Sequence, residues 1–535
     1  MDVTKSGSRR VLIADPLDDE GLRILEAAEG IEVEVKPGLA ADALKAIIGG
    51  YHGLVVRSAT NVTPDLLSAA DALEVIGRAG IGVDNVDVEA ASRRGVIVMN
   101  TPEGSAVTTA EHAIALLMAL ARRIPQATAS MKAGKWDKKR FMGTEMAGKT
   151  LGIVGIGNIG GIVADRARGL KMSVVACDPY MSEEVAAHKG IELVSLEGLL
   201  ARADFISIHT PLTKDTKHML DGAAFAKMKR GVLIVNAARG GIIHEGDLVK
   251  ALEQGQVGGA ALDVWEKEPP GENPLLSRDE VICTPHLGAS TEEAQVNVSV
   301  AVARQLVEFF GTGTIKNAVN VPSLTREMLA RLQPFLVLAE RLGRFLAQTF
   351  EGGVDEFHVE YCGELAETDN LSSVTAAGLK GLLAPMLGER VNVVNAPFLA
   401  RERGVHIVES KTGESRDFAS LIRMKVSGKS GQRLVCGTNF GRSNPRIVRI
   451  DNFYLEAHAG GHILMMHNQD KPGVVGAVGT LLGSSGINIA RMQLGLDAPT
   501  REAVALIQVD EPVPDEVLRK FAALPNIISV KQIEL

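Results

Sequence analysis

The sequence predicts an α/β protein with two doubly wound lobes, one inserted in the other, followed by two smaller α+β domains. Short β-branched runs alternate with amphipathic helical stretches over residues 10–100, a pattern typical of parallel βα units. The same alternation resumes over residues 149–285. Beyond residue 322 the pattern changes to mixed helices and strands, which indicates separate domains.

Length and composition are those of a multidomain globular protein. The 535 residues predict three or four domains at about 150 residues per domain. A net charge of −8 argues against nucleic-acid binding, since phosphate neutralisation needs a basic face. No apolar run approaches the roughly 20 residues of a membrane span, and the first residues do not form a secretory signal. We therefore expect a cytoplasmic protein that binds neither nucleic acid nor membrane. The four cysteines lie far apart, which predicts neither a disulfide framework nor a metal site.

The first lobe is predicted to be discontinuous. Its expected strands are VLIAD, IEVEV, GLVVRS, LEVIGRAG and VIVMN. After the second lobe, STEEAQVNVSVAVARQLVEFFGTG has apolar residues at helical spacing and would return the chain to the first lobe. We assign residues 1–103 and 290–322 to this lobe, called the outer lobe below.

The second lobe, residues 104–289, contains a glycine-rich turn after a strand. In LGIVGIGNIGG, Gly155, Gly157 and Gly160 follow the spacing G-x-G-x-x-G. The first glycine permits a tight turn, the second lets the backbone approach a pyrophosphate, and the third allows close packing of helix and strand. Glycine-rich turns also occur without a ligand, so this spacing alone does not establish a cofactor site.

An acidic residue strengthens the interpretation as a dinucleotide site. Asp178 ends the next strand, VVACD, where a carboxylate can accept hydrogen bonds from both ribose hydroxyls. Its charge repels the 2′-phosphate of NADP, and the following residues offer no arginine to hold that phosphate. We therefore predict a Rossmann-like domain that binds NAD. The alternative is that Asp178 caps a helix.

Three polar residues are expected where strands of the second lobe end at the cleft: Arg239 in NAARGG, Glu268 in DVWEKEP and His286 in CTPHLGAS. Imidazole carries protons near neutral pH, a neighbouring carboxylate raises its pKa, and the arginine fork binds a planar carboxylate. Singly, each residue has an ordinary structural explanation as a core histidine, a solvated loop charge or a helix cap. Together they predict oxidation or reduction at a C2 hydroxyl beside a carboxylate.

The C-terminal part is predicted to form two domains. Residues 323–458 mix helices with strands such as VDEFHVEYCG and RLVCGTNF, which indicates an α+β domain. Residues 459–535 follow the order β-α-β-β-α-β, the ferredoxin-like arrangement.

The motifs VGIGNIGG with Asp178, NAARGG, ALDVWEKEP and TPHLGAST resemble those of the D-isomer-specific 2-hydroxyacid dehydrogenase family. The whole chain resembles the long members, in which an intervening domain and a C-terminal ACT domain follow the two lobes. The resemblance implies NAD-dependent oxidation of 3-phospho-D-glycerate, with His286 carrying the proton, Glu268 as its partner and Arg239 binding the carboxylate. Two alternatives stay open: a dehydrogenase for another 2-hydroxy acid, such as glycerate or 2-hydroxyglutarate, or an NAD-sensing corepressor.

The resemblance also implies the remaining site residues. Expected NAD contacts are Gly155, Gly157, Asn158, Ile159, Gly160, Asp178, Thr210, Ala237, Arg239, Asp263, His286, Gly288 and Ala289. Some relatives have cysteine at the position of Ala237. Expected substrate contacts are Arg57, Ser58, Arg78, Gly80 and Arg239. Two arginines in the outer lobe suit a phosphorylated acid, although they could instead cap helices or pair with acidic residues.

Two further features concern partners. In the ACT-like segment, Asn468, Asp470 and Asn488 match positions that hold an amino-acid effector, which would be L-serine. The basic stretch within residues 132–140 resembles one that reaches a neighbouring subunit's active site. We therefore expect a homodimer or homotetramer.

Overall fold

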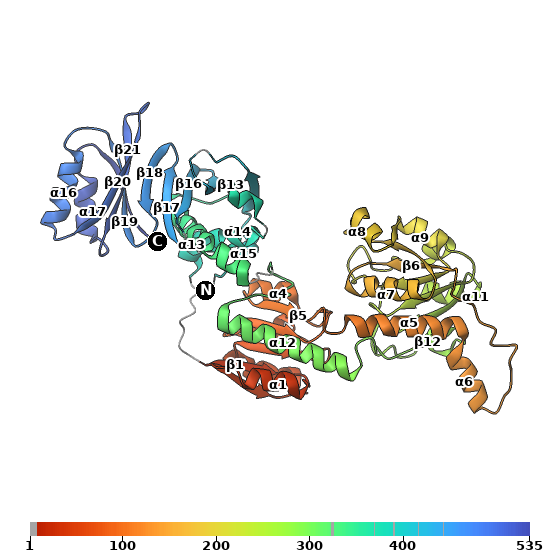
Figure 1. Ribbon diagram of the computed structural model, residues 1–535. Coiled ribbons are helices and arrows are strands. Elements are labelled where there is room, and N and C mark those ends of the chain that lie inside the picture. Colours follow the sequence, from red (N-terminus) through yellow and green to blue (C-terminus); the bar gives the residue numbers. More distant parts are fainter. Residues whose placement is uncertain (1–7, 323–325, 369, 389–390, 416, 442) are drawn as a thin grey trace.

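The computed structural model describes residues 8–535 except 323–325, 369, 389–390, 416 and 442. Figure 1 shows two α/β lobes joined by two long helices, with the third and C-terminal domains beyond the outer lobe. The predicted fold class is confirmed. The predicted boundary between outer lobe and third domain falls at residues 323–325, which lie outside the described residues. Within the described part of the chain, no helix is both long and apolar enough to cross a membrane.

The outer lobe is a five-stranded parallel sheet with the order β2-β1-β3-β4-β5. Its strands are β1 (Arg9–Ile13), β2 (Ile31–Val35), β3 (Gly53–Val56), β4 (Val75–Arg78) and β5 (Ile97–Asn100). Its helices are α1 (Asp19–Glu26), α2 (Ala41–Ile47), α3 (Pro64–Ser68), α4 (Val88–Arg93) and α12 (Glu292–Thr312). Strand β3 is buried throughout, which explains its continuous apolar sequence.

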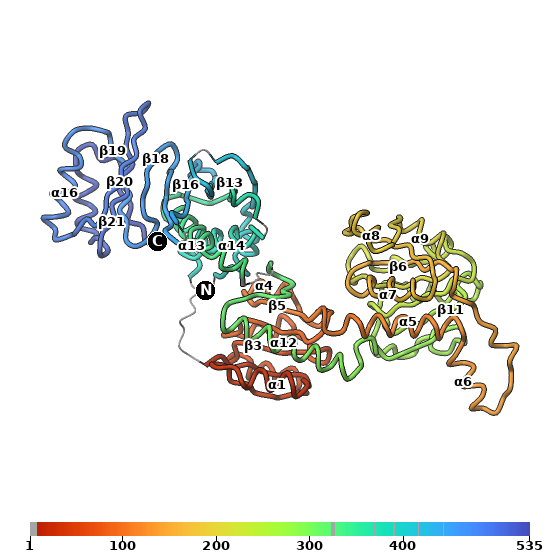
Figure 2. Tube along the Cα trace, in the orientation of Figure 1, coloured from red at the N-terminus to blue at the C-terminus, as the bar shows by residue number. Residues whose placement is uncertain are grey.

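Helix α12 packs on the outer lobe although it follows the second lobe in sequence. Figure 2 shows its green tube across the red and orange chain of that lobe. A Cβ at Gly77 of β4 would lie 2.6 Å from Val302 Cγ2, so strand and helix are in close contact. The polar N-terminus of α12 is capped by Thr291, whose side chain accepts a hydrogen bond from the Ala294 N–H.

The second lobe is a seven-stranded parallel sheet with the order β12-β11-β10-β9-β6-β7-β8. Its strands are β6 (Thr150–Val154), β7 (Ser173–Cys177), β8 (Glu192–Leu193), β9 (Phe205–Ile208), β10 (Val232–Asn236), β11 (Val257–Leu262) and β12 (Val281–Cys283). Its helices are α5 (Ala106–Arg122), α6 (Ile124–Lys132), α7 (Asn158–Gly169), α8 (Glu183–His188), α9 (Leu196–Arg202), α10 (Gly222–Ala226) and α11 (Glu245–Glu253). The strand order reverses between β6 and β9, and ligands of such sheets bind outside the carboxyl ends of the strands there.

The third domain has a six-stranded sheet with the order β14-β13-β15-β16-β17-β18. Its strands are β13 (Glu356–Gly363), β14 (His406–Thr412), β15 (Ser420–Gly428), β16 (Gly431–Phe440), β17 (Asn444–Ile450) and β18 (Phe453–His458). Its helices are α13 (Arg326–Thr349), α14 (Ser372–Leu387) and α15 (Ala396–Glu402). Helices α13 and α14 pack against each other and supply much of the core on this sheet.

The C-terminal domain has the predicted βαββαβ order. Its elements are β19 (His462–Gln469), α16 (Val474–Ser484), β20 (Ile489–Asp497), β21 (Glu502–Val509), α17 (Asp515–Ala522) and β22 (Ile527–Glu534). The four strands form an antiparallel sheet with the order β20-β21-β19-β22. Alternating buried residues of β19 and β21 pack against both helices.

Candidate active site

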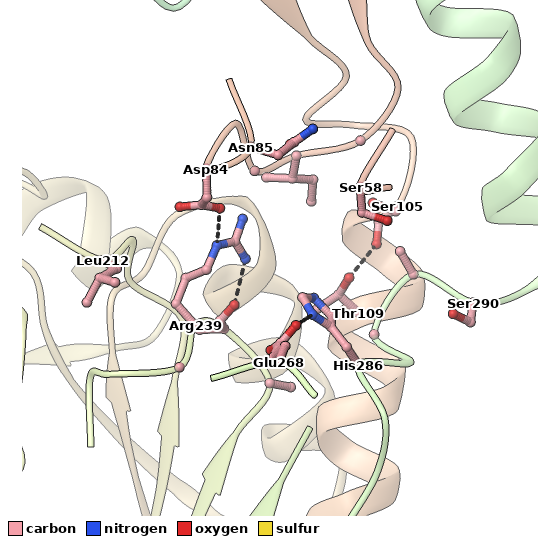
Figure 3. Close-up of a pocket in the computed structure, with 18 of the residues that line it drawn as sticks. Ser58, Asp84, Asn85, Ser105, Thr109, Leu212, Arg239, Glu268, His286 and Ser290 are labelled. Atoms are coloured by element: carbon pink, nitrogen blue, oxygen red, sulfur yellow. Dashed lines mark hydrogen bonds and ion pairs between the residues drawn. The ribbon is translucent and has the colours of Figure 1, made fainter. Parts of the chain in front are cut away.

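A cavity of about 1370 Å³ lies between the outer lobe and the second lobe. Figure 3 shows residues from both lobes facing it, with Asp84 and Ser58 opposite Arg239, Glu268 and His286. The predicted catalytic and substrate residues all line this cavity: Arg57, Ser58, Arg78, Gly80, Arg239, Glu268 and His286. The long segment before the glycine-rich turn therefore supplies one wall of the site.

His286 and Glu268 form a hydrogen-bonded pair, with Nδ1 of the imidazole 2.8 Å from Oε2 of the carboxylate. The second oxygen of Glu268 accepts a hydrogen bond from the Trp265 N–H at 3.2 Å. The hydrogen bond to Glu268 raises the pKa of His286, and burial opposes this effect. Burial would raise the pKa of Glu268, but hydrogen bonding to His286 and the charge of that residue lower it. The pair therefore favours a protonated imidazole beside an ionised carboxylate.

Asp263 fixes the loop that carries His286. Its fully buried carboxylate accepts hydrogen bonds from the Leu287 N–H at 2.7 Å, the Gly288 N–H at 2.8 Å and the Thr284 hydroxyl at 2.6 Å. The backbone N–H of His286 donates to the Asp263 carbonyl, and His286 itself has a φ of 58°. Such left-handed backbone at a non-glycine residue is held only where the surroundings enforce it.

The electrostatics of Asp263 agree with this supporting position. Burial alone would raise its pKa, yet hydrogen bonds from His112 and Thr284 and from the Leu287 backbone lower the pKa to about 2. Nε2 of His112 lies 3.2 Å from the carboxylate. Asp263 lies beneath the cavity and is not among the residues that line it. Its predicted contact with NAD stays a prediction.

The glycine-rich turn has the geometry that its spacing predicts. Gly155 has a φ of 89°, and a Cβ there would lie 2.6 Å from the His209 carbonyl oxygen. A Cβ at Gly160 would lie 2.1 Å from the Gly155 carbonyl oxygen, so helix α7 packs tightly on the turn. A Cβ at Gly157 would meet no atom within 4 Å, which leaves space for a ligand. Helix α7 begins directly after this turn, and a helix N-terminus attracts phosphate.

Asp178 lies next to the turn at the end of β7. Its carboxylate accepts hydrogen bonds from the Ile156 N–H at 2.9 Å and from the Tyr180 N–H at 2.8 Å. A carboxylate can accept further bonds, so these contacts leave capacity for ribose hydroxyls. Six other predicted NAD contacts line the cavity: Asn158, Ile159, Thr210, Ala237, Gly288 and Ala289. These residues fit a dinucleotide that extends from the turn into the cleft.

The arginines make the outer-lobe wall of the cavity basic. The Nε atoms of Arg57 and Arg78 are buried without a hydrogen-bond partner among the described residues. Burial and the nearby charge of Arg239 lower the pKa of Arg78 to about 10, so its side chain is still cationic at neutral pH. Arg239 Nε donates to the Asp84 carboxylate at 2.7 Å. Arg239 therefore pairs with an acidic residue of the outer lobe, while the two outer-lobe arginines each keep an unused Nε donor.

The predicted effector residues do not converge within one chain. Asn468 and Asp470 lie at and beyond the end of β19, where Asn468 is opposite Ala503 of β21. Asn488 precedes β20, whose first residue pairs with Val509 at the other end of β21, and its side chain donates to Asp510 at 2.9 Å. The antiparallel course of β20 separates these positions. A pocket that includes all three would therefore need residues of a second chain.

The sequence did not predict several residues that line the cavity. They include Asp84, Asn85, Ser105, Thr109, Cys283 and Gln295. Gln295 donates to the Ala289 carbonyl at 2.8 Å, and Thr109 to the Ser105 carbonyl at 3.0 Å, so both hold backbone near the cleft. For Asp84 the available signal was the segment GIGVDNVD, whose glycines indicate close approach of backbone to another group.

Three protein-family models match parts of the chain. The family model for the D-isomer-specific 2-hydroxyacid dehydrogenase NAD-binding domain matches residues 114–288. The model for the D-3-phosphoglycerate dehydrogenase intervening domain matches residues 331–451, and the ACT domain model matches residues 462–526.

Curated relatives match over almost the whole chain. D-3-phosphoglycerate dehydrogenase of Archaeoglobus fulgidus is 44% identical over 529 residues, covering 98% of this chain and 100% of that protein. The protein of the same name from Bacillus subtilis is 40% identical over 526 residues, covering 98% of this chain and 99% of its own length.

Solved structures match the two lobes. A glyoxylate reductase from Paecilomyes thermophila has a TM-score of 0.55 at 30% identity, covering 58% of this chain and 98% of its own. D-Lactate dehydrogenase from Aquifex aeolicus, complexed with NAD and lactic acid, has a TM-score of 0.52 at 26% identity, covering 58% of this chain and 100% of its own. On the domain order, the cleft and the full-length identity, the chain belongs to the D-isomer-specific 2-hydroxyacid dehydrogenase family of NAD-dependent enzymes, among the D-3-phosphoglycerate dehydrogenases with intervening and ACT domains.

Proposed function

We propose that this chain oxidises 3-phospho-D-glycerate to 3-phosphooxypyruvate with NAD, the first step of L-serine biosynthesis. The observation that carries the proposal is that one cavity brings together the His286–Glu268 pair, Arg239, and the two outer-lobe arginines Arg57 and Arg78. Each group matches one part of the substrate: the C2 hydroxyl, the carboxylate and the phosphate, respectively.

His286 moves the hydroxyl proton. Its Nδ1 is engaged by Glu268, so Nε2 is the nitrogen left to accept the proton of the C2 hydroxyl. Glu268 then stabilises the imidazolium that forms. The residues of the glycine-rich turn would hold NAD, which would supply the hydride acceptor for C2. In the reverse direction the imidazolium returns its proton to the carbonyl oxygen.

The arginines bind and orient the substrate. A guanidinium binds a planar carboxylate or phosphate through two parallel hydrogen bonds, which lysine cannot reproduce. Arg239 is placed to hold the carboxylate because it lies in the same cavity as His286. Arg57 and Arg78 have buried Nε donors without a partner in the described chain, and a phosphate would satisfy them.

A substrate panel tests the proposal. We expect kcat/KM for 3-phospho-D-glycerate to exceed that for D-glycerate by at least about tenfold, since each charge-assisted hydrogen bond is worth roughly 1.5–3 kcal/mol. NAD should be preferred to NADP. Arg78→Met should reduce activity with the phosphorylated acid and leave activity with D-glycerate nearly unchanged. Higher kcat/KM with D-glycerate or 2-hydroxyglutarate would contradict the assignment, and absence of any turnover would favour a corepressor.

We also propose a cytoplasmic homo-oligomer with L-serine as effector of the C-terminal domain. The separation of Asn488 from Asp470 within one chain supports an effector pocket shared by two subunits. Titration of the activity with L-serine tests the effector. Unchanged activity at millimolar serine would show that the domain has no such role under those conditions.

A further inference from the structure

Two of the three nitrogens of the Arg239 guanidinium, Nε and Nη1, have hydrogen-bond partners among the described residues. Nε donates to the Asp84 carboxylate at 2.7 Å, and Nη1 donates to the Ala238 carbonyl at 2.6 Å. Nη2 lies against Gly82, where a Cβ would be only 1.6 Å away. The loop that contains Gly82 and Asp84 therefore wraps around the side chain that is expected to hold the substrate carboxylate.

This loop belongs to the outer lobe and is fixed there. The Asn85 side chain donates to the carbonyls of Arg57 and Thr60, both at 2.6 Å. The Asn100 side chain donates to the Ile81 carbonyl at 2.6 Å. Asp84 is thus presented from a firmly held loop, although 61% of its own side chain is exposed.

The contact between Asp84 and Arg239 also joins the two lobes. Among ion pairs of the described residues, it is the one that links the outer lobe to the second lobe. In Figure 3, the Asp84 carboxylate reaches down from the outer lobe to the Arg239 guanidinium, beside the His286–Glu268 pair. The Asp84 carboxylate therefore occupies the guanidinium that is expected to bind the substrate carboxylate.

We propose that Asp84 is an internal competitor for the substrate carboxylate, a latch that the substrate displaces from Arg239. Both groups are carboxylates, and both need the donors of the same guanidinium. With Nε held by Asp84, the Nε–Nη2 edge of Arg239 cannot bind a ligand carboxylate through two parallel hydrogen bonds until the Asp84 contact breaks. The Asp84 contact costs little free energy to break, because its carboxylate is largely exposed and is readily solvated when released.

The latch lowers the affinity of every ligand that takes the place of Asp84 on Arg239. A ligand that displaces Asp84 must supply more binding free energy than one that meets a free arginine. The phosphate contacts at Arg57 and Arg78 would supply that difference. This proposal rests on the proposed function only in its assignment of Arg239 to the carboxylate.

Asp84→Asn tests the latch. We expect the dissociation constant and KM for 3-phospho-D-glycerate to fall about two- to fivefold, the range of an exposed ion pair, with kcat unchanged. Asp71→Asn is the matched control, because Asp71 forms an exposed ion pair with Arg94 at 3.1 Å in the same lobe and does not line the cavity. The control should leave the dissociation constant and KM unchanged.

A double-mutant cycle separates displacement from a general charge effect. If Asp84 acts through Arg239, the gain from Asp84→Asn disappears in an Arg239→Met background. A gain that persists there would overturn the latch, since it would report only the loss of a negative charge. A rise in KM or a large fall in kcat for Asp84→Asn would also overturn it, because Asp84 would then orient Arg239 during turnover.

Binding of oxalate keeps this test independent of the proposed reaction. Oxalate carries two planar carboxylates and no phosphate, and its dissociation constant can be measured by titration calorimetry without turnover. We expect tighter oxalate binding by Asp84→Asn than by the wild type and the Asp71→Asn control. Failure of the wild type to oxidise 3-phospho-D-glycerate would sink the proposed function alone, whereas equal oxalate affinities would sink the latch alone.

Discussion

The cleft between the two lobes and the junction between the third and C-terminal domains differ in the kind of contact that joins their two sides. Across the cleft, a cavity of about 1370 Å³ is bridged by the ion pair between Arg239 and Asp84. At the junction, one apolar cluster contains core residues of both domains. The C-terminal domain contributes Ile463, Met465, Val504, Leu506 and Ile533 to it. The cleft is therefore suited to opening, and the junction to holding two domains together.

The energies of these contacts follow the same division. Complete burial of one large apolar side chain is worth roughly 1.5–3 kcal/mol, and several are buried at the junction. An exposed ion pair such as that of Asp84 is worth about 0–1 kcal/mol. Lobe movement should therefore be inexpensive in free energy, while separation of the two C-terminal domains should be costly. An effector bound to the C-terminal domain would then act on a unit that includes the third domain.

The largest expected effect breaks the chemistry of the cleft without affecting the junction. His286→Ala should lower kcat by about 100- to 10,000-fold, because the proton carrier is removed. Its side chain is half exposed, so the free energy of unfolding should change little. Steady-state kinetics measures the loss, and titration with NAD checks that cofactor binding is retained. Near-normal kcat would show that His286 does not carry the proton.

The next effect breaks the junction without affecting the chemistry. Ile533→Ala removes a fully buried side chain from the shared cluster and should lower the free energy of unfolding by about 2–5 kcal/mol. Chemical denaturation followed by circular dichroism measures this change, and kcat of the folded enzyme should stay near the wild-type value. Ile528→Ala is the control on the same strand, because that side chain is 47% exposed. Equal destabilisation by both variants would contradict the buried junction.

A third change sharpens the description of the cleft through its pH dependence. Oxidation needs a neutral His286 as base, and the hydrogen bond to Glu268 raises its pKa. In the wild type, kcat/KM should therefore rise with pH through a midpoint above 6.5, the ordinary histidine value. Glu268→Gln should move this midpoint to lower pH and lower the maximal rate. A midpoint that does not move would show that another group controls the profile.

The two regions also differ in how far the sequence predicted them. Strands of the lobes are buried on both faces, so their continuous apolar runs marked them clearly, as in β3 and β9. Strand β14, with the sequence HIVESKT, is only partly buried and was not predicted. Strands β15, β17 and β18 were not predicted either. Helix α14 was also missed, because its small and apolar residues lie on all sides and show no amphipathic period.

The candidate site shows the same limit. Residue type and strand-end position were enough to bring His286, Glu268 and Arg239 together, because parallel strands end on one edge of a sheet. Asp84 could not be predicted in this way, since it is 155 positions from Arg239 and belongs to the other lobe. The separation of Asn488 from Asp470 likewise could not be predicted from their spacing in the sequence, because it depends on the direction of β20 in the sheet.

The smallest expected effect concerns the polar edge of the junction. The Gln348 side chain donates to the Glu534 carbonyl and accepts from the Glu534 N–H, both at 3.0 Å, and so ties α13 to the last strand. Gln348→Ala should lower the free energy of unfolding by about 0.5–1.5 kcal/mol, less than Ile533→Ala, because water can reach this exposed pair of backbone groups and replace the lost bonds. Thermal unfolding measures the shift, with the exposed Gln493→Ala as control. A loss as large as that of Ile533→Ala would mean that hydrogen bonds, and not apolar burial, hold the two domains together, and the contrast between cleft and junction would then fail.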